Sequence, residues 1–329
     1  MTRVGIIGQG RSGAHHCERL QLRNDCRIVA VGACDRTVGA WIAESGAELY
    51  DDARRLLRDE RVELVVVAEP PGTRSQLVVE ALRRGKHVLV DGPLASTLTD
   101  AHNIATTVRE TDRILSVFQP RRTNPDFQAA LATLADRRIG SLLDARLIAW
   151  DYAVPSASRQ GNNCSHADEN DPIESPGAHY FDQLLQLTGL QPVRVFARRF
   201  HQTDDDRHGF SAFVDFESGL TAQIEVATRS CVPLRTGWAL RTANGGYHNH
   251  TTYSLQPDGE IVDAPVTPDA TVDAYADVFA MIRANVPNAT GLAEAQRTVA
   301  LIEAARRSVE LETPVVVPAP RLNEQQLPS

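Results

Sequence analysis

The chain has 329 residues, of which 42% are hydrophobic and 23% charged, and its formal net charge is −8 at pH 7. This length is sufficient for two domains, each with its own hydrophobic core. The acidic balance and the lack of any lysine- or arginine-rich run argue against nucleic acid or an anionic membrane surface as a partner.

The first third of the sequence alternates short apolar runs with helical patterns. The runs expected to form strands of a buried parallel sheet are Arg3–Ile7, Arg27–Ala33, Leu64–Ala68, His87–Val90 and Ile114–Val117. The segments expected to form helices between them are Gly13–Arg23, Val38–Ser45, Ala53–Arg58, Arg74–Arg84 and Thr99–Thr111. Gly85 suits the end of the fourth helix, and Thr97 or Thr99 the start of the fifth. This alternation predicts an α/β, doubly wound Rossmann domain over residues 1–120, with ligands at the carboxyl ends of its strands.

A glycine pattern directly follows the first expected strand. The run Gly8-Gln9-Gly10-Arg11-Ser12-Gly13 has GxGxxG spacing and precedes a helical pattern, and an acid, Asp35, follows the second strand. In a dinucleotide site, Gly8 allows the tight turn, Gly10 lets backbone approach a diphosphate, and Gly13 lets the helix pack closely. The helix N-terminus offers N–H groups to the phosphates, and Asp35 would accept hydrogen bonds from the ribose. A glycine-rich turn of some other α/β protein is the alternative.

Two neighbouring residues bear on the choice of dinucleotide. Asp35 favours NAD over NADP, because its charge would repel a 2′-phosphate. Arg36 can either stack on the adenine or pair with that phosphate. The sequence therefore predicts NAD as the cofactor, with NADP as the alternative.

The pattern changes after Pro120. Helices are expected over Pro125–Asp136 and His179–Thr188, separated by the apolar segment Leu142–Tyr152 and a long polar loop. The strands expected beyond them are Val193–Phe200, Phe210–Phe216, Leu220–Ala227, Gly237–Thr242 and Thr251–Leu255. Two helices and a short strand are expected to close the chain over Asp273–Asn285, Gly291–Glu310 and Pro314–Pro318. These elements predict a second, α+β domain over residues 121–329, built on a mostly antiparallel sheet.

Cysteine usage points to a reducing compartment. The five cysteines are odd in number, contain no CxxC pair and are scattered: Cys17, Cys26, Cys34, Cys164 and Cys231. Neither a signal peptide nor an apolar stretch of membrane-spanning length is seen. We therefore expect a cytoplasmic protein without a disulfide framework.

Several segments, taken in order, make the chain resemble the Gfo/Idh/MocA family of NAD(P)-dependent oxidoreductases. They are the glycine turn with His16 after it, Val67–Pro71, Ala81–Val90, Arg122–Pro125, Gly177–Asp182 and the closing segment from Gly291 to Pro314. The resemblance covers nearly the whole chain. It implies a Rossmann domain, a substrate domain with an open sheet, and a homodimer or homotetramer formed through the face of that sheet. The residues that it places at the cofactor, besides the glycine turn, are Ala68, Glu69, Pro70, Asp91, Gly92, Pro93 and Gln119.

The chain departs from the family at the catalytic lysine. Family members usually carry Glu-Lys-Pro after the fourth strand, and the lysine helps to move the proton that accompanies hydride transfer. Here the tripeptide is Asp91-Gly92-Pro93. Lys86, which is the only lysine in the chain, lies at the opposite end of that strand, roughly 13 Å away at ~3.3 Å per residue. A second departure is Ser175, with Glu174 beside it, where the family commonly has an aspartate four residues before its active-site histidine.

The active-site histidine itself is retained as His179. Imidazole titrates near pH 6.5, so His179 is the leading candidate for handling the proton, and Tyr180 is a second catalytic candidate. Tyr152 and His166 are candidates for substrate contact. Arg122 matches a family position near the cofactor and could orient a substrate through its planar donor fork. The alternatives are a structural histidine at a helix start, ordinary packing or loop residues, and a solvated surface arginine.

The loop from Ser156 to Pro176 is rich in Asn, Ser and Asp and leads directly to His179. Loops of this length are usually functional or mobile, and we expect this one to cover the substrate pocket. Neither Cys164–Asp168 nor His248–His250 has a recognised zinc spacing, so no metal is expected. A cysteine–histidine nucleophile is also not favoured.

Three functions remain open from the sequence. The first is NAD-dependent transfer of a hydride to or from a secondary alcohol of a sugar, cyclitol or related polar metabolite. The second is a lyase, an epimerase or a glycoside-cleaving enzyme that oxidises its substrate transiently with a tightly held NAD. The third is a non-catalytic NAD-sensing regulatory protein, because the lysine is missing. The retained histidine and the pocket loop favour the first.

Overall fold

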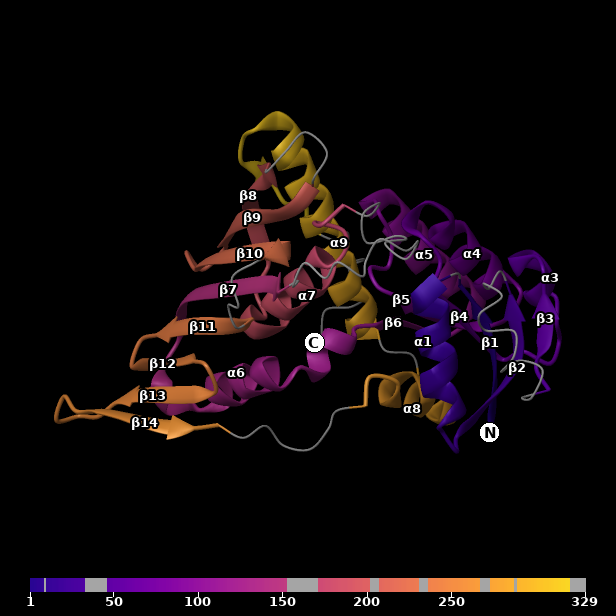
Figure 1. The fold of residues 1–329 in the computed structure, drawn as a ribbon, viewed down its shortest axis with the longest axis horizontal. Helices are drawn as coiled ribbons and strands as arrows, with labels where there is room; N and C mark the ends of the chain where they lie inside the picture. Colours follow the sequence, from indigo (N-terminus) through magenta and orange to yellow (C-terminus); the bar gives the residue numbers. More distant parts are fainter. Residues whose placement is uncertain are drawn as a thin grey trace, which may run out of the picture. The chain divides into compact units, whose positions relative to one another are not determined.

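The computed structural model describes residues 1–8, 10–32, 46–152, 171–201, 207–230, 236–266, 273–286 and 289–319. These residues form two compact units (Figure 1). The first contains the described parts of residues 1–119 and 273–299, and the second those of residues 120–272 and 300–320. The sequence predicted a single boundary at residue 120, which would place residues 273–299 in the second domain. In the structure these residues pack with the first unit.

The first unit is built on a parallel sheet, as predicted, and this sheet has six strands rather than the five expected. The strands are β1 (Thr2–Ile7), β2 (Cys26–Gly32), β3 (Glu48–Tyr50), β4 (Leu64–Val67), β5 (His87–Asp91) and β6 (Leu115–Phe118). Their order in the sheet is β3-β2-β1-β4-β5-β6. The order reverses between β1 and β4, and ligands of doubly wound sheets lie at such a switch point. The sequence did not predict β3, because a three-residue edge strand carries no apolar run long enough to be recognised.

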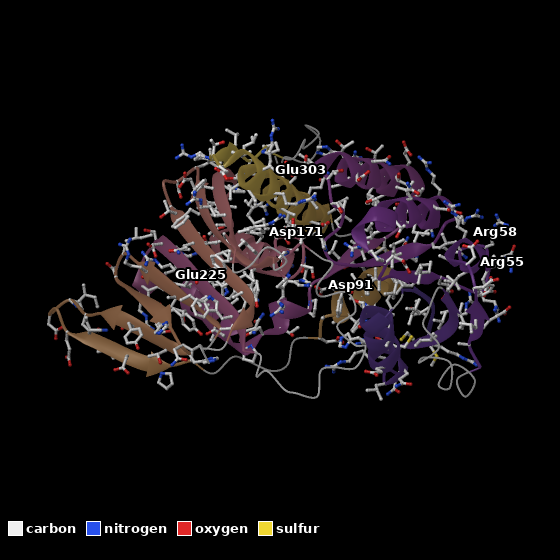
Figure 2. The ribbon with its side chains drawn as sticks, turned by 45° about the horizontal axis from the view of Figure 1, so that its top comes forward. Arg55, Arg58, Asp91, Asp171, Glu225 and Glu303 are labelled. Atoms are coloured by element: carbon white, nitrogen blue, oxygen red, sulfur yellow. The ribbon has the colours of Figure 1, made fainter. Side chains whose placement is uncertain are left out.

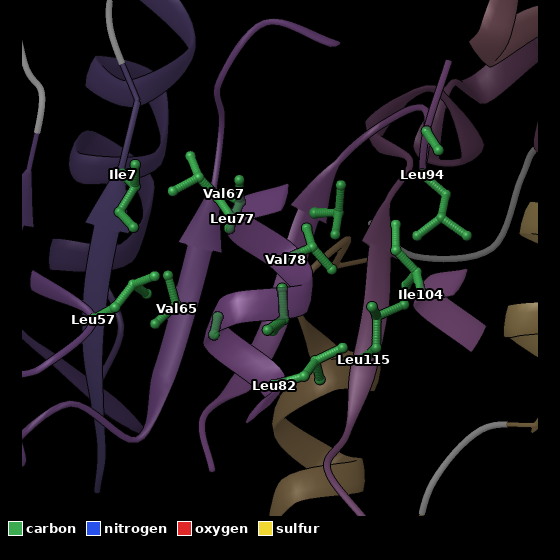
Figure 3. Packing of buried hydrophobic residues seen from close by; sticks show 14 of the residues in the cluster. Ile7, Leu57, Val65, Val67, Leu77, Val78, Leu82, Leu94, Ile104 and Leu115 are labelled. Atoms are coloured by element: carbon green, nitrogen blue, oxygen red, sulfur yellow. The ribbon is translucent and has the colours of Figure 1, made fainter. Parts of the chain in front are cut away.

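The side chains of these strands point alternately to the two faces of the sheet and pack into two hydrophobic cores, one on each face. Val65, Val67, Val88 and Val90 pack under the helices α3 (Ala53–Leu56), α4 (Pro71–Arg83) and α5 (Leu98–Thr111), as Figure 3 shows in part. The alternate residues, such as Leu64, Val66 and Leu89, pack under α1 (Gly10–Gln21) and α8 (Ala276–Ala284). Burial on both faces accounts for the continuous apolar runs in the sequence.

Helix ends in this unit follow the predicted signals. The Thr97 hydroxyl accepts a hydrogen bond from the N–H of Asp100 and so caps the start of α5. Gly85 follows α4 with φ of 73°, a left-handed conformation that glycine adopts without steric cost. α1 begins at Gly10, three residues earlier than predicted, because the helix starts inside the glycine turn.

The second unit holds a nine-stranded sheet in the order β14-β13-β12-β11-β7-β10-β9-β8-β15. Its strands are β7 (Leu142–Tyr152), β8 (Pro192–His201), β9 (Arg207–Phe216), β10 (Thr221–Ser230), β11 (Gly237–Thr242), β12 (Gly245–His248), β13 (Thr251–Leu255), β14 (Ile261–Pro265) and β15 (Val315–Val316). Among the described strands of this sheet, only β7 and β10 pair in parallel, so the sheet is mostly antiparallel, as predicted.

The helical elements of this unit are η2 (Pro120–Thr123), α6 (Pro125–Ala135), η3 (Arg137–Ile139), α7 (Gly177–Thr188) and the second half of α9 (Ala289–Leu311). α6 packs on β11 and β12, and α7 packs on β10. In β7, Ala145, Leu147 and Ala149 are buried, whereas Ile148 is 42% exposed. One face of the sheet is therefore packed and the other is open within this unit.

Two strands of the second unit were not predicted, for different reasons. β12 starts with Gly245 and Gly246, which have low strand propensity. A Cβ on Gly246 would lie 2.3 Å from the Leu240 carbonyl oxygen, so the close approach of β11 requires a glycine there. All five residues of β14 are exposed, which removes the alternation that identifies a half-buried strand. No helix in the described segments is long and apolar enough to cross a membrane.

Lys86 lies at the amino end of β5, as expected, and has a structural role there. Its ammonium group donates to the carbonyl oxygens of Asp59 (2.8 Å) and Val62 (2.7 Å), and burial lowers its pKa. These contacts join the start of β5 to the chain entering β4. The one lysine of the chain is thus occupied away from the carboxyl edge of the sheet.

We expect Lys86→Met to lower the free energy of unfolding by about 1–3 kcal/mol, because two buried carbonyl oxygens lose a charged donor. Chemical denaturation measures this change. The control is Arg84→Met, whose exposed ion pair with Glu80 should contribute less than about 1 kcal/mol. Affinity for NADH should change in neither variant. A Lys86→Met protein with unchanged stability and no turnover would contradict this assignment.

Candidate active site

The glycine turn is shaped by contacts that admit no side chain. The Gly8 N–H donates to the Gly32 carbonyl at 3.3 Å. A Cβ on Gly8 would lie 2.8 Å from the Ala68 Cβ, and a Cβ on Gly13 would lie 2.4 Å from the Gly8 carbonyl oxygen. α1 consequently starts directly on the turn, and its first N–H groups lie at the carboxyl edge of the sheet. Such a helix start suits a phosphate group.

The structure places only some of the other residues that were predicted at the glycine turn and the ribose. Gly10 and Arg11 are the first two residues of α1. Gln9, Asp35 and Arg36 lie outside the described residues.

The loop after β4 carries a buried carboxyl group. The Glu69 side chain is 8% exposed, and its Oε1 atom has no hydrogen-bond partner among the described residues. Burial raises the pKa of Glu69, and the nearby charge of Arg74 opposes this rise. Pro70 follows Glu69 and directly precedes α4.

Arg74 joins the loops after β4 and β5. It is buried in α4 and donates to the carbonyl oxygens of Glu69 (3.1 Å) and Pro93 (2.8 Å). Arg74 could not be recognised as a site residue from the sequence, because an arginine in the first turn of a helix normally indicates a solvated surface. Its role follows only from the proximity of two loops that are distant in sequence.

Asp91, labelled in Figure 2, ends β5 and begins the segment that replaces the family's lysine motif. The Ser12 hydroxyl, in the first turn of α1, donates to Asp91 Oδ2. The Gly92 N–H donates to the Phe118 carbonyl at 3.4 Å. A Cβ on Gly92 would lie 3.2 Å from that carbonyl oxygen and 3.3 Å from Gln119 Nε2, so a larger residue requires a shift of a few tenths of an ångström. The structure thus brings the predicted residues Ser12, Asp91, Gly92 and Gln119 into one neighbourhood.

Two further residues at this edge were missed. His16 in α1 and Tyr275, just before α8, are buried and joined by a 2.9 Å contact between Nδ1 and the hydroxyl. From the sequence, His16 was only part of the family resemblance and had no expected role. Tyr275 carried no signal at all, because residues 120–272 of the second unit separate it from the first part of the chain.

The predicted catalytic residues lie at the start of α7 in the second unit. His179 is the third residue of this helix, is partly buried, and donates its backbone N–H to the Pro176 carbonyl at 3.1 Å. Tyr180 is buried and its hydroxyl accepts a 2.7 Å hydrogen bond from Arg121, whose guanidinium also lies 4.8 Å from the ring centroid. This contact ties η2 to α7.

The predicted substrate residues have separate environments. Arg122 donates two 2.7 Å hydrogen bonds to the buried carboxylate of Asp182. The guanidinium group that was expected to orient a substrate is therefore already bound to a carboxylate of the protein. A substrate contact by Arg122 stays a prediction. Tyr152 is the last residue of β7, but its side chain is not described, and His166 and the rest of segment 153–170 lie outside the described residues. Within the described segments, no group of three or more His, Cys, Asp or Glu side chains could hold a metal ion.

Comparison with protein families assigns both parts of the chain. Residues 2–119 match the family described as "Oxidoreductase family, NAD-binding Rossmann fold", and residues 127–246 match the "GFO/IDH/MocA C-terminal domain". An inositol 2-dehydrogenase of Rubrobacter xylanophilus is 36% identical over 141 residues, which cover 42% of this chain and 41% of that protein. A myo-inositol 2-dehydrogenase of Thermotoga maritima is 29% identical over 234 residues, 68% of this chain and 63% of that protein. Each alignment thus spans less than two thirds of the relative.

Solved structures share the fold along nearly the whole chain. An NAD-binding protein from Listeria innocua superposes with a TM-score of 0.79 at 22% identity, covering 96% of this chain and 99% of that one. An oxidoreductase from Agrobacterium radiobacter, solved in complex with NAD+, L-tartaric acid and magnesium, has a TM-score of 0.78 at 19% identity. It covers 96% of this chain and 98% of that one.

The glycine turn gives a matched pair of substitutions. We expect Gly13→Ala to weaken NADH binding by about tenfold or more, because the new methyl group displaces α1 from the turn that positions its N–H groups. Gly72→Ala, in the first turn of α4, is the control, since a Cβ there meets nothing within 4 Å. Isothermal titration with NADH compares the two. Equal affinities would show that the close packing of α1 is irrelevant to binding.

Proposed function

This chain belongs to the GFO/IDH/MocA family of oxidoreductases with an NAD-binding Rossmann fold, and on that premise we propose that it is an NAD-dependent dehydrogenase. The reaction is transfer of a hydride to or from a secondary alcohol, or its keto form, on a sugar, a cyclitol or a related polar metabolite. The observation that carries the proposal is the glycine turn, in which Gly13 packs on Gly8 and presents the start of α1 at the sheet edge.

The residues at this edge fit the dinucleotide. The first N–H groups of α1 would bind the diphosphate, and the loops after β4 and β5 would flank the nicotinamide half. Asp35 would bind the adenosine ribose and favour NAD over NADP. The bound cofactor supplies the hydride acceptor or donor, and the protein must supply the group that handles the accompanying proton.

His179 is our candidate for that proton. The position of the family's lysine is Gly92, and Lys86 donates to two backbone carbonyl oxygens elsewhere. An imidazole titrates near neutral pH and can both accept the proton of an alcohol and return it to a ketone. Tyr180, whose hydroxyl is held by Arg121, would support this end of α7.

The named relatives support a proposal for the substrate class. Two of them are inositol 2-dehydrogenases, at 36% and 29% identity. We therefore propose a cyclitol or polyol substrate, and myo-inositol is the first compound to test.

Absorbance at 340 nm separates this reaction from the two alternatives. Net formation of NADH with myo-inositol or another polyol supports the dehydrogenase. Turnover without a net change, using copurified NAD, would indicate transient oxidation in a lyase or epimerase. Tight binding of NAD with no turnover on any polyol would indicate a cofactor-sensing protein.

We expect His179→Ala to reduce the turnover number by ~10²–10⁴, with little change in the dissociation constant of NADH. His248→Ala, on the exposed end of β12, is the control and should retain the wild-type rate. Steady-state kinetics and NADH titration measure both quantities. A wild-type rate in His179→Ala would remove this residue from the mechanism.

We also propose that the chain forms a homodimer or homotetramer through the open face of the second sheet. Phe213 (50% exposed) and Ile148 lie on that face, on strands β9 and β7, which both pair with β10. Trp150 donates to Glu225 at 3.0 Å between the paired strands β7 and β10. Exposed apolar side chains bordered by polar ones are typical of a protein interface.

Phe213→Glu should convert this oligomer to a monomer, because it introduces an unpaired charge at the centre of the interface. Light scattering coupled to gel filtration gives the mass directly. Ile261→Glu, on the edge strand β14, is the control and should leave the mass unchanged. A monomeric wild-type protein would refute the proposed assembly.

A further inference from the structure

A buried histidine lies behind the glycine turn. His16 is 1% exposed, and its ring packs edge-on against Phe118 with 4.8 Å between ring centroids. Its Nδ1 atom lies 2.9 Å from the Tyr275 hydroxyl. Its Nε2 atom has no hydrogen-bond partner among the described residues and lies 3.6 Å from Asp91 Oδ2, beyond hydrogen-bond length.

Asp91 connects this histidine to the start of α1. The oxygen atom that faces His16 also accepts the hydrogen bond from Ser12, which lies in the first turn of α1. A carboxylate is therefore held beside the helix start that we assign to the diphosphate. A negative charge there repels the phosphates and opposes the favourable helix dipole.

The inference rests on the proposed function. We propose that His16 is a positioning residue that couples proton uptake to dinucleotide binding. When the imidazole is protonated, Nε2–H pairs with Asp91 and cancels the carboxylate charge beside the diphosphate. When it is neutral, that charge remains and the dinucleotide binds more weakly.

Tyr275 makes this change specific to one nitrogen atom. Burial raises the pKa of Tyr275, which keeps its hydroxyl protonated. The hydroxyl can accept a hydrogen bond from Nδ1–H both in the neutral Nδ1–H tautomer and in imidazolium, so the added proton goes to Nε2. Nδ1 is thus satisfied in either charge state, and only the interaction between Nε2 and Asp91 changes when the ring gains a proton.

The other charged groups near the His16 ring are paired elsewhere or exposed, so we do not assign them this coupling of proton uptake to binding. Arg23, 5.9 Å from the centroid of Tyr275, is held in ion pairs with Asp25 and Asp273. Arg19 and Glu18 are exposed on α1. Partial loss of hydration and the adjacent His16 lower the pKa of His15, whose side chain is exposed.

The direction of the effect follows from linkage. If the protonated form binds the dinucleotide better, binding must increase proton uptake, and affinity must fall as pH rises and the imidazole loses its proton. At most one proton is taken up per dinucleotide by this pair. The loss of affinity should be about 3- to 10-fold between the two limits, as for a charge at a helix terminus.

The test is isothermal titration of the full chain with NADH from about pH 5.5 to about pH 8.5, in two buffers with different ionisation heats. We expect the wild-type dissociation constant to rise with pH and binding to take up protons at the lower end. His16→Gln keeps a hydrogen-bonding side chain that cannot gain a charge, so its affinity should not vary with pH. His15→Gln is the matched control and should retain the wild-type pH dependence.

A second variant keeps the test decisive if His16→Gln does not fold. Asp91→Asn retains an acceptor for Ser12 and removes the charge, so it should bind NADH more tightly than the wild type at high pH and lose the pH dependence. Wild-type pH dependence in a folded His16→Gln protein or in Asp91→Asn would overturn the inference while leaving NADH binding intact. A wild-type chain that binds neither NADH nor NADPH would instead refute the proposed function.

Discussion

The close contact between Gly13 and the Gly8 carbonyl is the constraint on which the rest of the candidate site depends. It forces α1 to begin directly on the turn after β1, because no side chain fits between them. Ser12 then reaches Asp91 at the end of β5, and His16, one turn further along α1, reaches Tyr275. One backbone contact thus sets the position of the helix start and of the polar groups behind it.

The loop that replaces the family's lysine motif is held from both sides. Asp91 is bound by Ser12, and the carbonyl oxygen of Pro93 is bound by the buried Arg74. Gly92 between them packs against the chain at the end of β6. The chain has therefore lost the amine but retained a defined backbone at that point, which is consistent with a modified active site.

Predictions from the sequence succeeded where a local pattern has a direct physical cause. The continuous apolar runs identified the buried parallel strands, since both faces of that sheet are covered. Thr97 and Gly85 marked helix ends through their own side-chain and backbone chemistry. The predictions that failed concern features that no local sequence pattern marks. β14 is exposed on both faces, β12 depends on glycines that admit a neighbouring strand, and residues 273–299 return to a unit that the chain had already left.

The sequence by itself determined the Rossmann domain, the glycine turn, the absence of a second lysine and the retention of His179, because each of these is a property of residue order or composition. Tertiary structure alone decided which polar groups meet. Arg74 bridges two loops, Asp182 holds Arg122, and Tyr275 contacts His16 across 259 positions of sequence. Such pairs produce no periodic pattern and no characteristic spacing in the sequence, because they depend on how separate elements pack in the folded chain.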